Sequence, residues 1–359
     1  MVLSGGGTGG HVYPGLAVGR ALQRRARNPV ELLYIGVKGR VDERIVPAEG
    51  VPFKAVAGGQ VRVGPVGGLI GLARLALGSL QALVMLRRER PDAVFATGGY
   101  ASVPVGVAAR LLRLPLVVFL PDVRPGWAVR LLARLASRMA TASEAALAFL
   151  PREKTHVVGY PVRDEFWSVE RDEARRRLGL PQDERVLLVY GGSLGAHAIN
   201  EAVFAQLPRL VERCVVLHVT GQADGALAAR ARERLPERLR ERYRPVAYLR
   251  ELPAAMKAAD LAVTRAGAAV LGELPAAGLP AILVPGVFEG HDQTPNAEYL
   301  ASKGAAVVLP QTRLGELADQ ALALLDDREK LAAMAANARA LARPDAADAL
   351  ADLLLEVAA

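Results

Sequence analysis

The sequence predicts an α/β protein with two domains, each built on a parallel β-sheet. The chain has 359 residues, which suggests two domains at an ordinary size of about 150 residues each. Short apolar runs rich in Val and Leu alternate with helical stretches, a pattern typical of parallel strands covered by helices on both faces. Several of these runs end in glycine-rich turns, and both halves of the chain open with a strand followed by such a turn.

The predicted elements follow this pattern along the chain. Four strands are expected in the first half, at 32–35, 93–96, 116–120 and 157–158, and four in the second, at 186–190, 215–220, 261–264 and 281–284. Helices are expected at 15–27, around Arg209 and at 298–303, and a last helix at 345–357 follows the break at Pro344. A strand ends before Arg163 and a charged segment follows. The two domains are therefore predicted as residues 1–163 plus about 344–359, and 164–343.

The composition excludes several classes of protein. Apolar residues make up 52% of the chain and charged residues 23%, which excludes intrinsic disorder. The single cysteine, Cys214, excludes a disulfide framework and a cysteine metal cluster. The five histidines show no paired spacing for zinc, so no metal or cofactor is expected. The chain runs from Met1 directly into a glycine-rich loop, and no signal peptide is predicted.

The charge is distributed unevenly between the two predicted domains. Residues 1–163 hold 22 Lys and Arg against 9 Asp and Glu, a net charge of +13. The rest of the chain holds 23 against 28, a net charge of −5. A basic first half favours an anionic partner there: nucleic acid, an anionic membrane or a phosphorylated substrate. The alternative is an arginine-rich surface without a dedicated partner.

One segment, 69–86, is apolar enough to test as a membrane element. It is 18 residues long and contains Arg74, so it is too short and too polar for a predicted transmembrane helix. As a helix it would be apolar on more than one face, with arginines at its ends. We expect it either to lie on an anionic membrane surface or to be buried in the first domain. The residues predicted to meet the membrane are Leu69, Ile70, Leu72, Leu75, Arg87 and Arg88.

The first glycine-rich loop follows a strand and precedes a helix expected from about Pro14. Gly5, Gly7 and Gly10 match the pattern G-x-G-x-x-G, which lets a backbone approach a phosphate at a helix N-terminus. The second strand is not followed by the acidic residue of a dinucleotide site, which disfavours an NAD-dependent enzyme. Because no Lys-Ser/Thr pair follows the glycines, the loop is not a P-loop. A tight structural turn remains the alternative.

Further segments strengthen the case for a ligand site. Turns at 97–100 and 191–196 also follow predicted strands and precede helices. Glycine turns at the carboxyl ends of parallel strands lie at the edge where open α/β sheets bind ligands. In the segment 264–274, Gly267 allows close approach of a diphosphate, and the Glu273 carboxylate is a candidate to accept hydrogen bonds from a ribose diol. The alternative for Glu273 is an ordinary exposed residue of a helix. The polar segment 291–297 carries groups able to recognise sugar hydroxyls.

Taken together, the motifs resemble the MurG family nearly end to end. The most specific stretch is Gly6-Gly7-Thr8-Gly9-Gly10-His11 followed by Pro14-Gly15-Leu16-Ala17. The other matching motifs, in the family's order, are Gly98-Gly99-Tyr100, Pro161-Val162-Arg163, Gly191-Gly192-Ser193, Arg265-Ala266-Gly267, Glu273 with Ala276-Ala277-Gly278-Leu279-Pro280, and Gln293 with Asn296-Ala297. The resemblance implies a GT-B fold, in which two Rossmann-like parallel-sheet domains face each other across an interdomain cleft.

The resemblance also implies an activity and a set of site residues. The family transfers GlcNAc from UDP-GlcNAc to undecaprenyl-pyrophosphoryl-MurNAc-pentapeptide (lipid I), with inversion, in peptidoglycan synthesis. Four residues are implied in donor binding: Arg163 and Ser193 at the diphosphate, Glu273 at the ribose and Gln293 at the GlcNAc hydroxyls, with uracil held near Tyr248 and Leu249. The residues implied at the lipid-linked acceptor are Thr8, Gly9, Gly10, His11 and Tyr100.

Two departures from the family pattern affect recognition of the substrates. Phe119-Leu120-Pro121-Asp122 stands where the family commonly has His-Glu-Gln-Asn, and Asp292 stands where it has His or Gln. An inverting transfer needs a base that deprotonates the acceptor hydroxyl, and His11 is the first choice for it, with Asp122 as the rival. The leaving UDP is expected to be stabilised by helix N-termini, loop amides and Arg163, because no Asp-x-Asp metal motif is present.

The resulting hypothesis is a peripheral enzyme at the cytoplasmic face of the cell membrane. Its expected partners are UDP-GlcNAc, lipid I, an anionic membrane surface and other cell-wall enzymes, and no nucleic acid. The alternatives are another GT-B enzyme, such as a glycolipid glycosyltransferase or a UDP-GlcNAc 2-epimerase, and a non-catalytic nucleotide-binding protein of the cell-wall machinery.

Overall fold

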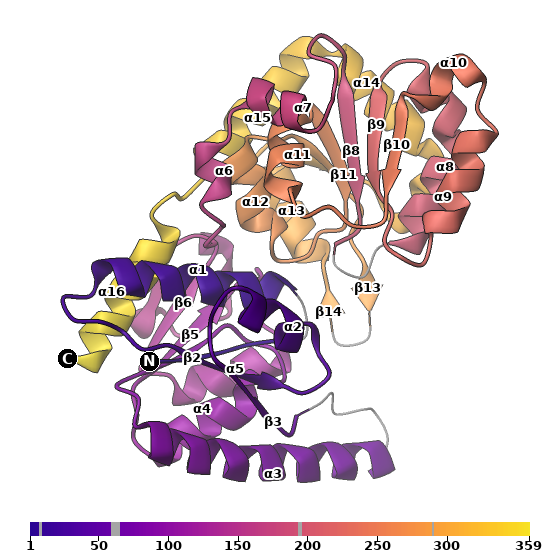
Figure 1. Cartoon of the computed structure of the whole chain (residues 1–359). Helices are drawn as coiled ribbons and strands as arrows, with labels where there is room; N and C mark the ends of the chain where they lie inside the picture. The colour runs from indigo at the N-terminus through magenta and orange to yellow at the C-terminus, as the bar shows by residue number, and fades with distance from the viewer. Residues whose placement is uncertain (7–8, 59–64, 193–195, 289–290) are drawn as a thin grey trace. The chain divides into compact units, whose positions relative to one another are not determined.

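The computed structural model describes residues 1–6, 9–58, 65–192, 196–288 and 291–359, which form two compact units (Figure 1). Unit 1 comprises Met1–Arg163 and Arg343–Ala359, and unit 2 comprises Asp164–Ala342. Each unit has its own parallel sheet covered by helices, so the predicted class of two Rossmann-like α/β domains is confirmed.

Unit 1 is built on a seven-stranded sheet in which all neighbouring strands run parallel. Its strands, in spatial order, are β3 (Phe53–Val56), β2 (Leu33–Val37), β1 (Val2–Ser4), β4 (Val94–Ala96), β5 (Leu116–Leu120), β6 (Arg138–Thr141) and β7 (Thr155–Val157). In the centre, Leu3 lies opposite Tyr34 of β2 and Phe95 of β4. The chain leaves β1 toward β2 and returns on the other side at β4, so the topological switch point lies between β1 and β4.

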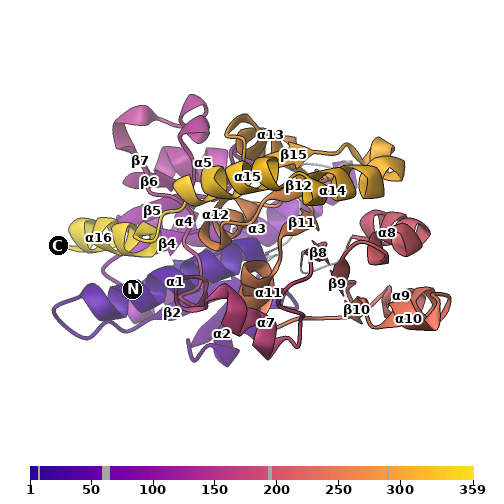
Figure 2. The same ribbon diagram turned by 90° about the horizontal axis from the view of Figure 1, so that it is seen from above.

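Helices cover both faces of this sheet (Figure 2). One face carries α1 (Gly9–Arg25) and α2 (Val41–Ala48), and the other carries α3 (Pro65–Glu89), α4 (Ser102–Leu111) and α5 (Trp127–Leu135). Two short 3₁₀-helices, η1 (Glu144–Ala148) and η2 (Arg152–Lys154), precede β7. The last helix, α16 (Ala346–Ala358), packs against α1, where Arg25 pairs with Asp352 at 2.6 Å. The C-terminal segment therefore completes unit 1.

Unit 2 is built on a six-stranded parallel sheet with its switch point between β8 and β11. Its strands, in spatial order, are β10 (Tyr243–Val246), β9 (Val215–Val219), β8 (Val186–Tyr190), β11 (Leu261–Thr264), β12 (Ala281–Leu283) and β15 (Ala306–Val308), and a separate hairpin pairs β13 (Val287–Phe288) with β14 (His291–Asp292). Its helices are α6 (Glu165–Ser168), α7 (Arg171–Arg177), α8 (His197–Val211), α9 (Gly225–Glu233), α10 (Glu237–Arg240), α11 (Leu252–Ala258), α12 (Val270–Ala277), α13 (Thr294–Ser302), η3 (Gln311–Glu316), α14 (Leu317–Asp326) and α15 (Arg328–Ala340).

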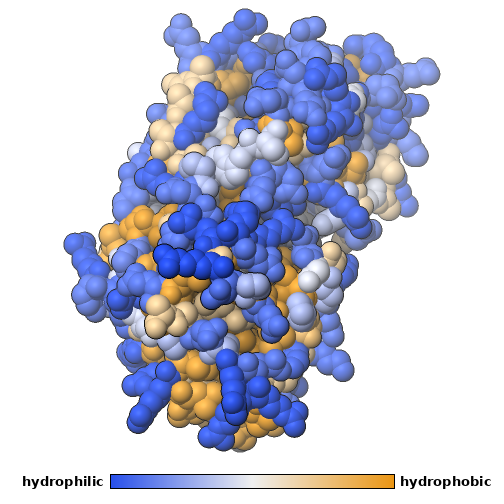
Figure 3. Space-filling view, turned by 60° about the vertical axis from the view of Figure 1, so that its left-hand side comes forward, coloured by the Kyte–Doolittle hydropathy of each residue, from blue (hydrophilic) through white to orange (hydrophobic). Residues whose placement is uncertain are grey.

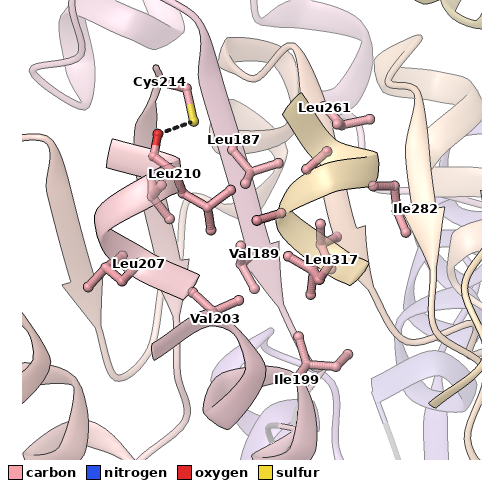
Figure 4. Packing of buried hydrophobic residues seen from close by; sticks show 14 of the residues in the cluster. Leu187, Val189, Ile199, Val203, Leu207, Leu210, Cys214, Leu261, Ile282 and Leu317 are labelled. Atoms are coloured by element: carbon pink, nitrogen blue, oxygen red, sulfur yellow. Dashed lines mark hydrogen bonds between the residues drawn. The ribbon is translucent and has the colours of Figure 1, made fainter. Parts of the chain in front are cut away.

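The core of unit 2 shows how its layers are held together. Leu187 and Val189 of β8 pack against Val203 and Leu207 of α8 and against Leu317 of α14 (Figure 4). Cys214 lies in the same cluster, where its thiol donates to the carbonyl oxygen of Leu210 at 3.3 Å. Burial raises the pKa of this thiol to about 12, so Cys214 serves as a small apolar residue and not as a nucleophile.

The structure contains strands that the sequence pattern did not indicate. The strands β3, β10 and β15 lie at sheet edges, and β6 lies beside the edge strand β7. Edge strands are half-exposed, so they do not need a continuous apolar run. The strand β10 also contains Pro245, which only an edge strand accommodates easily. The helix predicted at 15–27 begins at Gly9, a correction with consequences for the site.

Candidate active site

In both units, the glycine-rich segments of the sequence lie at the switch point of the sheet. In unit 1, Gly5 and Gly6 follow β1, Gly9 and Gly10 begin α1, and the segment 97–100 follows β4. In unit 2, Gly191 and Gly192 follow β8, and the segment 265–267 follows β11. Open α/β sheets bind ligands at this place because the adjacent loops diverge there and leave a crevice. Each unit therefore offers a candidate ligand site at its carboxyl edge.

The two loops of unit 1 touch through their backbones, which explains their glycines. Gly99 has a φ of +78°, and a Cβ added there would lie 2.6 Å from the carbonyl oxygen of Gly6. A Cβ at Gly5 would lie 1.9 Å from Oγ1 of Thr97. No side chain fits at either position, so only glycine allows the two loops to lie in direct contact.

His11 lies in the first turn of α1 and not in the preceding loop. Gly9 and Gly10 adopt the helical conformation, so the helix begins about five residues before the predicted Pro14 start. The hydroxyl of Thr97 donates to the carbonyl oxygen of His11 at 2.6 Å. A Cβ at Gly98 would lie 3.7 Å from Nε2 of His11, so the imidazole lies directly against the glycine turn after β4.

A proline inside α1 leaves room for a contact between this helix and the residues just before the unit boundary at Arg163. Pro14 has no N–H and cannot donate to the carbonyl oxygen of Gly10, four residues earlier. The hydroxyl of Tyr160 donates to this oxygen instead, at 2.9 Å. Three residues later, the guanidinium carbon of Arg163 lies 5.0 Å from the ring centroid of Tyr13, a cation–π contact. The predicted residues Gly10 and His11 therefore lie in α1, and the predicted residue Arg163 contacts the same helix.

The loops after β4 and β5 supply the other predicted residues of unit 1. Asp122 is half-buried in the loop that follows β5. Tyr100 follows the glycine turn after β4, and its ring centroid lies 5.5 Å from that of Trp127, at an interplanar angle of 54°. Since β1, β4 and β5 are neighbours, His11 at the start of α1 and the loops that carry Tyr100 and Asp122 share one edge of the sheet. Sequence reasoning did not select Trp127, although an aromatic residue directly after Pro125-Gly126 was a usable signal.

In unit 2, two predicted residues lie close to the turn after β11. Glu273 lies in the first turn of α12. Burial, and secondly the charge of Glu273, raise the pKa of the Tyr190 hydroxyl at the end of β8, the strand beside β11. The side-chain oxygen of Gln293 accepts a hydrogen bond from the Gly286 amide at 2.9 Å. A Cβ at Gly267 would lie 3.7 Å from Nε2 of Gln293, which directs this amide group toward the same turn.

The residues predicted near the uracil lie after β10, and two other predicted residues cannot be placed. Leu249 is half-buried after β10, and Tyr248 beside it is 60% exposed. Thr8 and Ser193 lie outside the described residues. Arg163 lies in unit 1, whereas the other residues predicted for the donor belong to unit 2.

A histidine that the sequence did not single out begins α8, just after the glycine-rich segment 191–196. Nδ1 of His197 lies 2.9 Å from Asp224 and its Nε2 lies 3.3 Å from Glu201. The hydrogen bond to Asp224, followed by the charges of Asp224 and Glu201, raises the pKa of His197. Asp224 also accepts from Asn200, which contacts the buried His218 at 2.9 Å. This network fixes the start of α8.

Metal-binding side chains do not gather in the part of the chain that the structure describes. Within those ranges no group of three or more His, Cys, Asp or Glu residues is arranged to hold a metal ion.

Helix α3 has an unusually apolar exposed face. Its 70–89 portion is, among the described residues, the one helix long and apolar enough to cross a membrane by length and composition, and 22% of its apolar window is buried. Ala82 and Leu86 are buried in unit 1, so one face of the helix belongs to the core. Hydrophobic residues reach the surface at the lower end of the molecule in Figure 3, the end where α3 lies in Figure 1. The exposed apolar residues of α3 include Ile70, Leu72, Leu77, Leu80 and Val84.

The predicted membrane residues are distributed over this helix. Ile70, Leu72, Arg87 and Arg88 are exposed, and Leu75 is half-buried. Leu69 lies in α3, and its side chain is outside the described part of the chain.

Residues 1–141 match the glycosyltransferase family 28 N-terminal domain, and residues 186–350 match the C-terminal domain of the same family. The chain belongs to glycosyltransferase family 28. A relative from Roseiflexus sp. (strain RS-1), named UDP-N-acetylglucosamine–N-acetylmuramyl-(pentapeptide) pyrophosphoryl-undecaprenol N-acetylglucosamine transferase, is 40% identical over 98% of this chain and 93% of its own length. A relative of the same name from Methylococcus capsulatus is 40% identical over 100% of this chain and 98% of its own length.

Solved structures agree with this family 28 assignment. The crystal structure of Acinetobacter baumannii MurG has a TM-score of 0.75 and 26% identity, with 99% of both chains covered, and the predicted MurG resemblance and GT-B class are confirmed. A UDP-GlcNAc 2-epimerase from Neisseria meningitidis bound to UDP-GlcNAc has a TM-score of 0.69, with 99% of both chains covered. At 13% identity it shows the shared fold alone.

Proposed function

We propose that this chain transfers GlcNAc from UDP-GlcNAc to the C4 hydroxyl of MurNAc in undecaprenyl-pyrophosphoryl-MurNAc-pentapeptide, with inversion, to make lipid II for peptidoglycan. The observation that carries the proposal is the match to relatives of this name at 40% identity over nearly the whole chain. The glycine-rich loops at the switch points of both sheets support it, because the reaction needs two sites for phosphorylated substrates.

The donor is assigned to unit 2. The Glu273 carboxylate accepts hydrogen bonds from the ribose diol, and Gln293 donates to the GlcNAc hydroxyls. The segment around Leu249 holds the uracil, and Ser193 contacts the diphosphate. Amide groups at the start of α8 and the Arg163 guanidinium stabilise the negative charge that develops on UDP as it leaves. The buried environment of Gln293 supports its role, because a fixed amide selects one sugar orientation.

The acceptor is assigned to unit 1, with Thr8, Gly9, Gly10 and Tyr100 around its pyrophosphate and sugar. His11 removes the proton from the C4 hydroxyl while the bond from the anomeric carbon to UDP breaks. A neutral imidazole suits this step because its ordinary pKa is about 6.5. The contact of His11 with the Gly98 turn supports the assignment, since it fixes the ring at the carboxyl edge of the sheet. Asp122 is the alternative base.

The enzyme works at the cytoplasmic face of the membrane, where its lipid-linked acceptor lies. Helix α3 docks its exposed leucines into the interface, and Arg87 and Arg88 meet anionic headgroups. The net charge of +13 on residues 1–163 supports this orientation. Other cell-wall enzymes are proposed as neighbours on the same surface.

The experiment that tests the function is a UDP-release assay with the full chain and UDP-GlcNAc, with and without a short-chain lipid I analogue. We expect UDP release only with the analogue, and a product heavier by one N-acetylhexosamine. Conversion of UDP-GlcNAc without acceptor would indicate an epimerase. UDP-GlcNAc binding without any turnover would indicate a non-catalytic nucleotide-binding protein.

A further inference from the structure

The end of β5 and the first residue of the loop after it cannot recognise a ligand. Phe119 and Leu120, which end β5, are at most 1% exposed, and Pro121, which begins the loop, is buried as well. Phe119 packs against the ring of Tyr160 at 6.2 Å. Their side chains belong to the core of unit 1. Any recognition here must come from the solvent-facing part of the segment 122–127, which consists of the half-buried Asp122 and the exposed Arg124, Gly126 and Trp127.

Trp127 is the largest side chain in that part. Its residue is 39% exposed, although it begins α5, whose next two residues are buried. Tyr100, from the neighbouring loop after β4, backs the indole at 5.5 Å. A Cβ added at Gly126, just before it, would have nothing within 4 Å apart from its two chain neighbours, so space is open at Gly126. The two rings form an aromatic corner at the carboxyl edge of the sheet.

Two features of this corner indicate the kind of molecule that covers it. A flat, partly exposed indole gains most from a partner that is itself flat and apolar on one side, and a pyranose ring presents such a face of C–H groups. The same molecule needs groups that bind its hydroxyls, and the carboxylate of Asp122 lies in the same loop.

We propose that Trp127, backed by Tyr100, is the platform on which the pyranose ring of the saccharide acceptor stacks. The proposal rests on the proposed function and adds a residue that determines how the acceptor is bound. In this role the indole orients the sugar so that one hydroxyl faces the edge that carries His11 and Asp122. The platform recognises the acceptor and makes no contact with the uridine of the donor.

Fluorescence provides the direct test, because the chain contains two tryptophans. The Trp167→Phe variant leaves Trp127 as the single reporter, and Trp167 lies in α6 of unit 2, outside the proposed sites. We expect a short-chain lipid I analogue, and MurNAc-pentapeptide without lipid, to change the Trp127 emission. UDP and anionic vesicles should leave it unchanged. A response to UDP alone would assign the corner to the nucleobase, and a response to vesicles alone would assign it to the membrane; either result overturns the proposal.

Kinetics provide the second test. Trp127→Ala should raise the KM for the lipid I analogue roughly tenfold and leave the KM for UDP-GlcNAc unchanged, while Trp127→Phe retains most of the binding. Leu111→Ala is the matched control, because Leu111 is 66% exposed at the far end of α4. An unchanged acceptor KM in Trp127→Ala would refute the platform while leaving the transferase activity intact. A wild-type chain without turnover would refute the proposed function, and the fluorescence assay would still decide whether the corner binds the sugar.

Discussion

The guanidinium carbon of Arg163 lies 5.0 Å from the ring centroid of Tyr13, so the last residue before the unit boundary rests on the helix that carries His11. The hydroxyl of Tyr160 reinforces the contact through the carbonyl oxygen of Gly10, which Pro14 leaves without its helical partner. Helix α1 thus carries His11, the proposed base, and also supports Arg163, the residue proposed to bind the diphosphate. Substitutions at Tyr13 should therefore affect the donor through Arg163.

Replacement of Tyr13 by Leu removes the aromatic face and should raise the KM for UDP-GlcNAc by roughly two- to tenfold, the range of a partly exposed cation–π contact. Tyr13→Phe keeps the ring and should restore nearly wild-type kinetics. Initial-rate measurements at varied donor concentration check this. Equal loss in both variants would show that the hydroxyl, and not the ring face, is the important group.

The general base is tested at His11 and Asp122. His11→Ala should lower kcat by roughly 10²- to 10⁴-fold with little change in either KM, because a base acts mainly in the transition state. Asp122→Asn should have a smaller effect. UDP release at saturating substrates measures both. The opposite ranking, with Asp122→Asn the more severe variant, would transfer the role of base to Asp122.

Helix α3 is tested with vesicles of anionic and neutral lipid. The double variant Leu72→Ser, Leu80→Ser should weaken sedimentation with anionic vesicles, because it removes two exposed apolar side chains from the proposed interface. Arg87→Glu with Arg88→Glu should weaken binding further, with a strong salt dependence. Leu111→Ser is the control for exposed apolar surface elsewhere on unit 1. Unchanged vesicle binding in all variants would contradict the interfacial role of α3.

Chelation tests the expected absence of a metal requirement. Stabilisation of the leaving UDP is assigned to helix N-termini, loop amides and Arg163, and we expect EDTA-treated enzyme to retain most of its activity. UDP release before and after EDTA, with Mg²⁺ added back, measures this. Complete loss of turnover with recovery on Mg²⁺ would contradict the assignment.

The pH dependence of stability is predicted from His218. Burial lowers the pKa of His218 to about 3, below the ordinary value of about 6.5 that applies to the unfolded chain. The stabilisation is therefore complete above about pH 6.5 and is lost as the pH falls below it, because the unfolded chain then binds a proton that the folded chain excludes. Urea unfolding should show a loss of roughly 1 kcal/mol from this group between about pH 7.5 and 5.5.

The control for this prediction is a variant without the buried imidazole. His218→Gln should have lower stability at neutral pH, since contacts to Tyr243 and Asn200 change, and a shallower pH dependence than the wild type. His197 acts in the opposite direction. Because its pKa is raised, its stabilising contribution is present at low pH and is lost as the pH rises through the raised value. An identical loss of stability on acidification in wild type and His218→Gln would refute the attribution of this loss to His218.

Much of the fold could be predicted because the central strands of both sheets are buried on both faces. Strands such as β5 and β8 are continuous apolar runs, and the sequence indicated both correctly. The start of α1 was predicted too late, because glycines ordinarily disfavour helix and Pro14 is typical of a first turn. What overrides these preferences is a contact 150 residues away, between Tyr160 and Gly10.

The sequence by itself determined the two-sheet class, the positions of the glycine-rich turns and the family, because burial patterns and turn chemistry are local properties. Only the tertiary structure decided that Tyr13 supports Arg163, that Trp127 meets Tyr100 and that α3 leaves its leucines exposed. These relationships depend on which loops share a sheet edge and on which face of a helix is buried in the core. Both follow from strand order and packing between distant segments, which no local pattern contains.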